Sequence, residues 1–356
     1  MKNKGPLFIV PWRCTFACDS NCVHCTSAGK PAANDEVDTT GAMKIVDEIC
    51  DFGASFFGVT GGQPFLRKDL FQVIAHAREL GLNTSIITDG KMLDKDAFEN
   101  IVKNQVKISV SLDGSEKTND AIRGRGAYAA AVSAIDLFSK EKLLNVIVYT
   151  FANADNGVTN VNETDMRHVL DLARSYEARW VVFHGMIPYS SAKECLKADP
   201  TPQQYEWVCN KLFDLAAEYN GKPAVNVYIP FYARVAKQRG MQDFDGWYNN
   251  FFLGRCFFGK FFSVAENGDA IPCSYNDAYR LGNVKDKKLA QIWDEMQSGE
   301  FFAKVKDKSN LKGKCGVCEY RELCGGCRSA ALYYTGDIFE SDPRCAYIPQ
   351  TLREKQ

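Results

Sequence analysis

Hydrophobic and polar positions follow two alternating patterns along most of this chain. Short apolar runs of four to seven residues recur, and each precedes a segment with apolar residues every three or four positions. The first pattern is typical of buried strands and the second of amphipathic helices. Strands are expected at 7–10, 54–60, 83–88, 107–112, 145–151 and 180–183. Helices are expected at 39–51, 68–80, 95–103, 127–138, 163–174 and 202–219.

Two helix starts carry capping signals. Thr39 or Thr40 is expected to cap the first helix, because a threonine hydroxyl can accept a hydrogen bond from a free amide of the first turn. The helix at 202–219 has Thr201 as its expected cap, with Pro202 in its first turn.

Six strand–helix units in succession predict an α/β protein whose parallel sheet is covered by helices. Such a sheet can be open and doubly wound, or curved into a partial barrel. In both architectures the chemistry lies at the carboxyl ends of the strands.

Length and charge narrow the possible functions. The chain has 356 residues, enough for one barrel or two smaller domains, and its net charge is -1. Nucleic-acid binding normally requires a basic excess, so it is not expected. No apolar run approaches the roughly 18 residues that would span a membrane, and the apolar stretch at the N-terminus is too short for a signal peptide. A cytoplasmic protein is expected.

Fourteen cysteines are unusual for such a chain, because disulfide-dense proteins are generally small and secreted. Eleven of them fall in two groups, at 14–25 and 256–345, which favours metal binding. Of the others, Cys50 and Cys209 lie on apolar helical faces and are expected to be core residues. Cys195 lies in a polar loop, and its role is open.

The first cysteine group directly follows the first expected strand. Glycine-containing loops follow the next three strands, as "TGGQP" at 60–64, "TDG" at 88–90 and "SLDG" at 111–114. Because the carboxyl ends of parallel strands share one edge, these segments should meet. Glycine there permits close approach of the backbone to a ligand.

The spacing Cys18-x3-Cys22-x2-Cys25 after the first strand, with "GGQP" after the second, resembles the radical SAM superfamily. The resemblance implies a partial (β/α)6 TIM-like barrel. It also implies that these three residues, the first-loop cysteines, hold a [4Fe–4S] cluster whose fourth iron binds S-adenosylmethionine (SAM). Reduction of SAM would then yield a 5'-deoxyadenosyl radical, so that the cofactor supplies the difficult chemistry.

The same resemblance suggests which residues contact SAM. Gly61, Gly62, Gln63 and Pro64 match the loop that holds its amino group, although relatives usually have glutamate in place of Gln63. A glutamine is uncharged, so either SAM binds more weakly or another carboxylate contributes.

Further contacts to the ribose and carboxylate of SAM are implied after the fourth strand. Ser111, Asp113 and Arg123 match these positions, and Arg125 is an alternative to Arg123.

A zinc site is the alternative for the first-loop cysteines. Structural zinc takes four ligands, and Cys14 or His24 could be the fourth. The glycine loops and the strand–helix scaffold favour the iron–sulfur interpretation, in which His24 is a packing residue.

The second cysteine group resembles the SPASM extension of this superfamily, which implies domains at 1–235 and 236–356. Cys256, Gly268 and Cys273 fit its first half, with "ENGD" at 266–269 as a hairpin turn. Its second half is Cys315-x2-Cys318-x5-Cys324-x2-Cys327, followed by Cys345.

The resemblance divides these seven residues between two auxiliary clusters. One cluster would be fully ligated by the tail cysteines, Cys315, Cys318, Cys324 and Cys345. The other would have only three thiolates, from the hairpin cysteines, Cys256, Cys273 and Cys327. With the SAM-binding cluster, this gives three [4Fe–4S] clusters per chain.

The implied function is a radical SAM/SPASM oxidoreductase or maturase. It would abstract hydrogen from a side chain of a ribosomal peptide or protein, or of a tetrapyrrole in haem-type biosynthesis, with a ferredoxin or flavodoxin-type reductant. Only 13 residues precede Cys14, so no leader-binding domain is expected, and Ser274 replaces the aspartate that sulfatase maturases carry. No catalytic acid or base is identified. The alternative is a non-catalytic iron–sulfur electron-transfer protein, which would need no SAM-binding loops.

Overall fold

The computed structural model describes residues 9–187, 193–241 and 254–354. Its centre is a parallel sheet in which β1 to β7 lie side by side in sequence order. These strands are β1 (Ile9–Arg13), β2 (Phe56–Thr60), β3 (Asn83–Thr88), β4 (Lys107–Ser111), β5 (Leu144–Thr150), β6 (Trp180–His184) and β7 (Ala224–Tyr228). Sequential order with parallel pairing is the topology of a (β/α) barrel, so the predicted partial barrel is confirmed and the doubly wound alternative is wrong.

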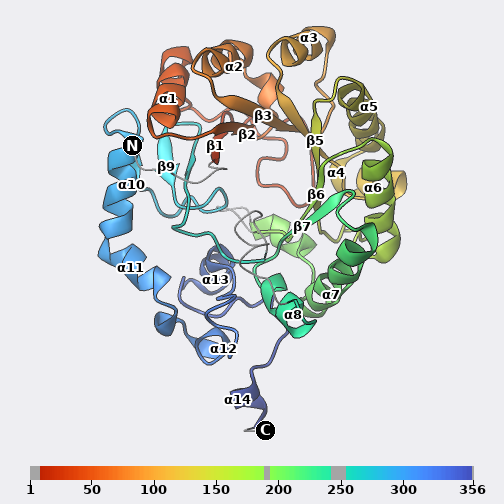
Figure 1. The fold of residues 1–356 in the computed structure, drawn as a ribbon, viewed down its shortest axis with the longest axis vertical. Coiled ribbons are helices and arrows are strands. Elements are labelled where there is room, and N and C mark those ends of the chain that lie inside the picture. The colour runs from red at the N-terminus through yellow and green to blue at the C-terminus, as the bar shows by residue number, and fades with distance from the viewer. Residues whose placement is uncertain (1–8, 188–192, 242–253, 355–356) are drawn as a thin grey trace.

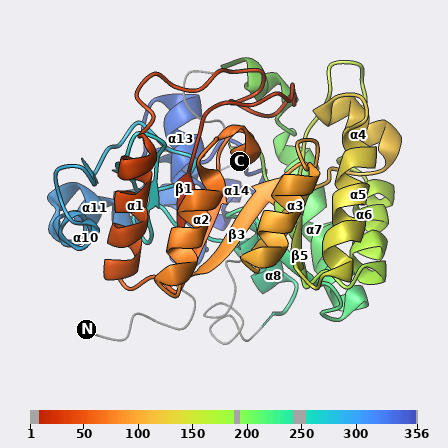
Figure 2. The same ribbon diagram turned by 90° about the horizontal axis from the view of Figure 1, so that it is seen from above.

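Helices cover the outer face of this sheet, and Figure 2 shows the first few side by side along it. The principal ones are α1 (Thr39–Asp51), α2 (Leu70–Glu79), α3 (Lys95–Lys103), α5 (Ala127–Lys140), α6 (Glu163–Ser175) and α7 (Pro202–Tyr219). Each buries an apolar stripe, such as Ile45 and Ile49 of α1, against strand residues such as Val10 and Phe57. At about 25 cal/mol per Å² of buried apolar surface, this layer is the main source of stability.

Of the two predicted helix caps, one is present in the structure and the other is not. Thr201 caps α7, with a capping box completed by Gln204, as expected. Neither Thr39 nor Thr40 caps α1. Asp38 does so, because it has the extended backbone of a cap and its carboxylate accepts the amide hydrogen of Gly41 at 2.8 Å.

Several elements were not anticipated. A seventh strand, β7, follows α7, and two short helices, α4 (Glu116–Arg123) and α8 (Tyr232–Gln238), lie in segments for which no element was predicted. Polar Asn226 at the middle of β7 weakens its apolar run. The first strand was expected at 7–10, of which 7–8 lies outside the described residues, and β1 extends to Arg13.

The C-terminal segment extends the barrel sheet. The predicted hairpin is present as β8 (Ser263–Val264) and β9 (Asp269–Ile271), and β10 (Gly282–Asn283) pairs with β9. Val264 pairs with Trp12 of β1, so the described strands form one ten-stranded sheet with β7 and β10 at its edges. An ion pair between Arg13 and Glu266 reinforces this junction.

Beyond the hairpin, short helices curve around the open side of the barrel toward α8 (Figure 1). They are α10 (Leu289–Ser298), α11 (Glu300–Lys306) and α12 (Gly313–Gly316), whereas α13 (Arg328–Thr335) lies inside this arc and α14 (Gln350–Arg353) projects away from it. Within the part of the chain described here, no helix has the length and apolarity needed to cross a membrane.

Candidate radical and iron–sulfur site

The first-loop cysteines lie close together on the segment between β1 and α1. The amide of Cys25 donates to the carbonyl of Cys22 at 3.1 Å, and the amide of Cys18 donates to the carbonyl of Lys30 at 2.9 Å. Burial, with a smaller contribution from the neighbouring thiol of Cys25, raises the pKa of Cys22 to about 12, although Arg123 acts in the opposite direction. Burial and the Cys25 thiol also raise the pKa of Cys18. Mutual repulsion of this kind is what a bound cation or cluster would relieve.

Cys14 belongs to the hydrophobic core. Its side chain is fully buried among the residues of β1, β2 and α1, and burial raises the pKa of its thiol to about 12. Its amide hydrogen-bonds to the carbonyl of Thr60, which extends the pairing of β1 with β2. This position suits a small core residue better than a fourth ligand.

Gly61 and Gly62 hold the cysteine loop against the end of β2. A Cβ atom on Gly61 would lie 2.5 Å from the carbonyl oxygen of Thr15, and one on Gly62 would lie 2.1 Å from that of Ala17. The amides of Gly62 and Gln63 donate to these same two carbonyls, at 2.9 and 2.7 Å. Only glycine permits this contact, so these glycines position the cysteines directly.

Gln63 is buried and paired with a carboxylate. Its amide nitrogen donates to Asp89 Oδ1 at 2.7 Å, and its amide oxygen lies 3.4 Å from the hydroxyl of Thr88. The other oxygen of Asp89 accepts from Ser20 of the cysteine loop at 2.6 Å. A negative charge is therefore present beside Gln63, supplied by the loop after β3. Pro64 follows as the first residue of a short 3-10 turn, Pro64–Leu66.

Asp113 and Arg123 form a buried ion pair at the end of β4. Asp113 is fully buried, accepts from Arg123 Nε, and takes a second hydrogen bond from the amide of Thr150 at 2.7 Å. Burial alone would lower the pKa of Arg123, but Asp113 holds it above its ordinary value. Ser111, the last residue of β4, is also buried, whereas Arg125 is exposed. Of the two arginines, the structure thus brings Arg123 to the site.

His24 lies beside this pair, with Nε2 3.8 Å from Asp113 Oδ2. Burial lowers the pKa of its imidazole to about 4, although the Asp113 carboxylate acts in the opposite direction. A neutral, buried ring agrees with the expected packing role.

The hairpin cysteines converge from three segments. The amide of Arg328 approaches Cys256 Sγ at 3.5 Å, and the amide of Ala330 approaches Cys327 Sγ at 3.4 Å. Burial raises the pKa of Cys273 to about 11, and the Cys256 thiol adds to it. Burial likewise raises the pKa of Cys327 to about 12, with a further contribution from Cys256.

The tail cysteines line a single pocket of ≈ 400 Å³. Arg234, Lys314 and Arg321 contribute to its wall, and the amide of Gly326 donates to Cys324 Sγ at 3.3 Å. Four thiols and several cationic groups around one space fit an anionic cluster with thiolate ligands.

Among the described residues, no three His, Cys, Asp or Glu side chains are grouped closely enough to hold one metal ion.

Cys195 is buried on the short helix Lys193–Ala198, which follows β6. Its pKa is raised by burial and next by the thiol of Cys25. This unplaced cysteine therefore lies near Cys25 of the first loop. Cys209 is in the core of α7 and Cys50 packs against the core from α1, as expected.

Aromatic residues that were not anticipated line the region between the two cysteine groups. His184 ends β6 and stacks on Tyr228, which ends β7, with ring centroids 4.7 Å apart. Tyr275, two residues after Cys273, meets His184 edge-on at 5.9 Å. His184 directly follows the strand expected at 180–183, which was the available signal for it, but no spacing motif marks Tyr228 or Tyr275.

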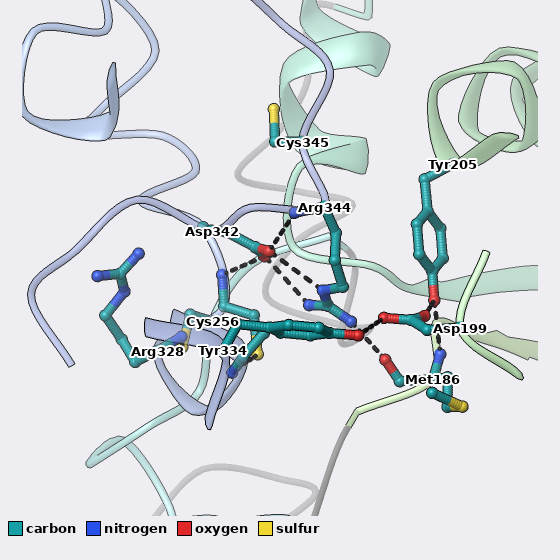
Figure 3. Close-up of polar contacts among 12 residues, drawn as sticks. Met186, Asp199, Tyr205, Cys256, Arg328, Tyr334, Asp342, Arg344 and Cys345 are labelled. Atoms are coloured by element: carbon teal, nitrogen blue, oxygen red, sulfur yellow. Dashed lines mark hydrogen bonds and ion pairs between the residues drawn. The ribbon is translucent and has the colours of Figure 1, made fainter. Parts of the chain in front are cut away.

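A hydrogen-bonded network joins the barrel to the C-terminal segment (Figure 3). Asp342 accepts from the amide of Cys327 at 2.9 Å and forms an ion pair with Arg344. Arg344 also donates to the carbonyl of Met186, just after β6. Tyr334 of α13 and Tyr205 of α7 both donate to Asp199. The geometry of the hairpin cysteines is therefore tied to the end of the barrel.

Comparison with known families identifies two domains. The radical SAM superfamily profile matches residues 12–173, and that of the iron–sulfur cluster-binding SPASM domain matches residues 256–319.

Curated relatives match almost the whole chain. An AdoMet-dependent heme synthase of Methanosarcina barkeri is 28% identical over 354 residues, covering 96% of this chain and 97% of that protein. An Fe-coproporphyrin III synthase of the same organism is 24% identical, with 97% and 88% covered. A PqqA peptide cyclase of Xanthomonas euvesicatoria is 26% identical, with 94% and 86% covered.

Solved structures share the fold. Streptococcus suis SuiB bound to S-adenosylmethionine superposes with a TM-score of 0.74 at 15% identity, covering 96% of this chain and 77% of that one. Native anSMEcpe with bound AdoMet gives a TM-score of 0.70 at 19% identity, covering 96% and 94%.

Proposed function

The chain is a radical SAM enzyme with a C-terminal SPASM domain, and from this premise we propose that it acts on a carboxylate-bearing side chain of a tetrapyrrole. The sequence match to an AdoMet-dependent heme synthase over nearly the full length of both proteins is the observation that carries this proposal. The expected alternative, a non-catalytic electron carrier, is not supported, because the curated relatives are named as synthases and cyclases.

We assign three [4Fe–4S] clusters to the three sets of cysteines. The first-loop cysteines would hold the SAM-binding cluster, the hairpin cysteines one auxiliary cluster, and the tail cysteines the other. When bound and reduced, the first cluster supplies the electron that cleaves SAM to the 5'-deoxyadenosyl radical. The domain boundary near residue 235 belongs to the same proposal.

The residues of this chain would orient SAM from three strand ends. Gln63 and Asp89 present an amide oxygen and a carboxylate, which suit an ammonium group. Ser111 contributes a hydroxyl, and Arg123 a guanidinium suited to a carboxylate. Gly61, Gly62 and Pro64 act indirectly, by fixing the cysteine loop against β2.

The aromatic residues support a flat substrate. The stacked rings of His184 and Tyr228, with Tyr275 edge-on, form an aromatic surface between the first-loop and hairpin cysteines. Aromatic faces bind extended π-systems by offset stacking. A macrocycle held here would lie between the SAM site and the auxiliary cluster.

A peptide substrate is the second candidate, favoured by the similarity to PqqA peptide cyclases. The two candidates make different predictions for a labelled substrate. Iron-coproporphyrin deuterated on its propionate side chains should transfer deuterium into 5'-deoxyadenosine, detected by mass spectrometry after anaerobic reaction with SAM and dithionite. Deuterium transfer from a side-chain-deuterated peptide, with none from the porphyrin, would establish the peptide alternative.

The proposal also includes the type of reductant and the cellular compartment. Lys314 and Arg321 beside the tail cysteines would favour an acidic one-electron carrier of the ferredoxin or flavodoxin type. None of the described cysteines forms a disulfide, which agrees with a reducing, cytoplasmic location.

A further inference from the structure

Arg328 is a buried cation whose hydrogen bonds are incomplete. It is the first residue of α13, directly after Cys327, and only 2% of it is exposed. Nη1 donates to the carbonyls of Ile338 and Glu340 at 2.7 and 2.8 Å. Nε and Nη2 are also buried, and neither has a hydrogen-bond partner among the described residues.

The neighbouring arginine has the partners that Arg328 lacks. Arg344 donates to Asp342 through both Nε and Nη2, each at 3.1 Å, and its Nη1 donates to the carbonyl of Met186. Figure 3 shows the guanidinium of Arg328 turned away from this pair. Asp342 is therefore neutralised by Arg344 and does not serve Arg328. No ion pair within the described parts of the chain includes Arg328.

An unpaired buried guanidinium is energetically expensive. Desolvation penalises a buried ion, and every buried donor without an acceptor adds to that cost. Such a group persists in a folded protein when an anion lies beside it.

The candidate anion on the free side of the guanidinium is the cluster of the tail cysteines. Asp337, whose pKa is lowered chiefly by Lys312 and also by Arg328, is already paired with Lys312. A Cβ atom placed on Gly326 would lie 2.9 Å from Arg328 Nη2 and 3.4 Å from Cys315 Sγ. The free side of the guanidinium and one of the tail thiols therefore meet at the same glycine. Gly326 also has a φ of +64°, so two independent features, backbone conformation and space, keep a side chain out of this contact.

We propose that Arg328 is the buried counter-charge of the cluster held by the tail cysteines, donating its Nε and Nη2 hydrogens to sulfur and raising the cluster's reduction potential. Hydrogen bonds to the sulfurs and nearby positive charge both favour the reduced, more anionic form. Arg328 is thus a tuning residue rather than a catalytic one. The inference rests on the cluster assignment proposed above.

Arg328→Gln removes the charge and keeps some hydrogen-bonding capacity, whereas Arg328→Lys keeps the charge. Each holoenzyme would be titrated anaerobically and followed by electron paramagnetic resonance, with iron and sulfide counted in the same samples. At a fixed ambient potential, Arg328→Gln should lower the reduced-to-oxidised ratio of this cluster about tenfold, which is about 59 mV for a one-electron couple. Arg328→Lys should recover at least half of that shift.

Arg321→Gln is the matched control. Arg321 lines the same pocket, but its side chain is 34% exposed and pairs with Glu322, so solvent should screen its effect to a small fraction of that of Arg328. Equal shifts in the two Gln variants, or no shift in Arg328→Gln at full iron content, would overturn the proposal.

If Arg328→Gln does not retain the cluster, the Arg328→Lys variant decides the test. A cluster-loaded Arg328→Lys protein with a potential close to that of wild type supports the counter-charge. One whose reduced-to-oxidised ratio falls tenfold overturns it. If the wild-type protein shows no cluster on the tail cysteines, the cluster assignment itself is wrong.

Discussion

The side-chain amide of Gln63 donates a 2.7 Å hydrogen bond to the carboxylate of Asp89, and both residues are buried. The sequence presents Gln63 as a lost charge, because the resemblance implies glutamate at that position. In the structure the charge lies one strand away, at the end of β3. The pair therefore has one negative charge and one hydrogen-bond donor. Which of the two positions carries the charge matters less than the match between a carboxylate and a donor.

Replacing Gln63 with glutamate should therefore destabilise the protein. Gln63→Glu would place two buried carboxylates in contact and remove the donor, so one of them would have to take up a proton on folding. We expect a loss of about 2–4 kcal/mol in unfolding free energy at pH 8, measured by anaerobic urea denaturation. The loss should shrink as the pH falls, because the shared site in the folded state then binds its proton more readily.

A charge exchange provides the control for this prediction. In Gln63→Glu/Asp89→Asn the donor and the carboxylate change places, so most of the lost stability should return. A Gln63→Glu protein as stable as wild type at pH 8 would show that the two side chains are not in contact.

Removing the first-loop cysteines should remove one cluster. Changing Cys18, Cys22 and Cys25 together to alanine should lower the iron content from about twelve to about eight per chain, given four irons per cluster, and abolish SAM cleavage. Cys14→Ala should keep both iron and activity, because Cys14 lies in the hydrophobic core. Its cost should be limited to stability, as expected for a small buried side chain. Iron loss in the Cys14 variant would contradict the ligand assignment.

The order of strands and helices was predictable because each element carries its own apolar period. The helix bounds at 39–51, 95–103 and 202–219 and the strand bounds at 83–88 were predicted correctly. β7 was missed because it is short and has polar Asn226 at its centre. Asp38 was missed as a cap because two threonines next to it have similar side-chain chemistry.

The site residues also differ in how far the sequence reveals them. The first-loop cysteines stood out by their close spacing on one loop, whereas the division of the other seven into two sets was implied by the family resemblance. The partners of Asp89 and His184 were not visible, because they come from segments far apart in sequence that meet only in the folded barrel. Asp342 and Cys327 are only 15 residues apart, but no periodic pattern relates them either.

Protonation of His184 should make stability depend on pH. Burial lowers the pKa of this imidazole to about 4, against a smaller opposing effect of Asp113, whereas in the unfolded chain it is near 6.5. Below pH 6.5 the unfolded chain therefore binds a proton that the folded protein does not, and stability falls as the pH drops toward 4. His184→Phe keeps a ring against Tyr228 and should flatten this slope between pH 7.5 and 5.5. The check is the unfolding free energy at several pH values, and parallel slopes for the two proteins would count against a buried neutral His184.

The last prediction concerns the iron that the hairpin cysteines leave without a thiolate. In the proposed assignment Cys256, Cys273 and Cys327 supply three ligands, and a cubane has four irons. Cys195 is the remaining cysteine that could complete the set, but burial and next the thiol of Cys25, a residue of the first loop, raise its pKa. We therefore expect Cys195→Ser to keep the full iron content and the electron paramagnetic resonance signal of this cluster unchanged.

An open iron can also be detected directly, because it can bind a small added ligand. A small exogenous ligand such as cyanide should shift the resonance of the hairpin cluster while leaving that of the tail cluster in place, because in the proposed assignment the tail cysteines ligate all four irons of their cluster. Substrate binding at an open iron would let the electron leave directly, whereas a closed cluster accepts it only through space. Loss of iron in Cys195→Ser, or equal insensitivity of both auxiliary clusters to cyanide, would mean that the hairpin cluster is closed.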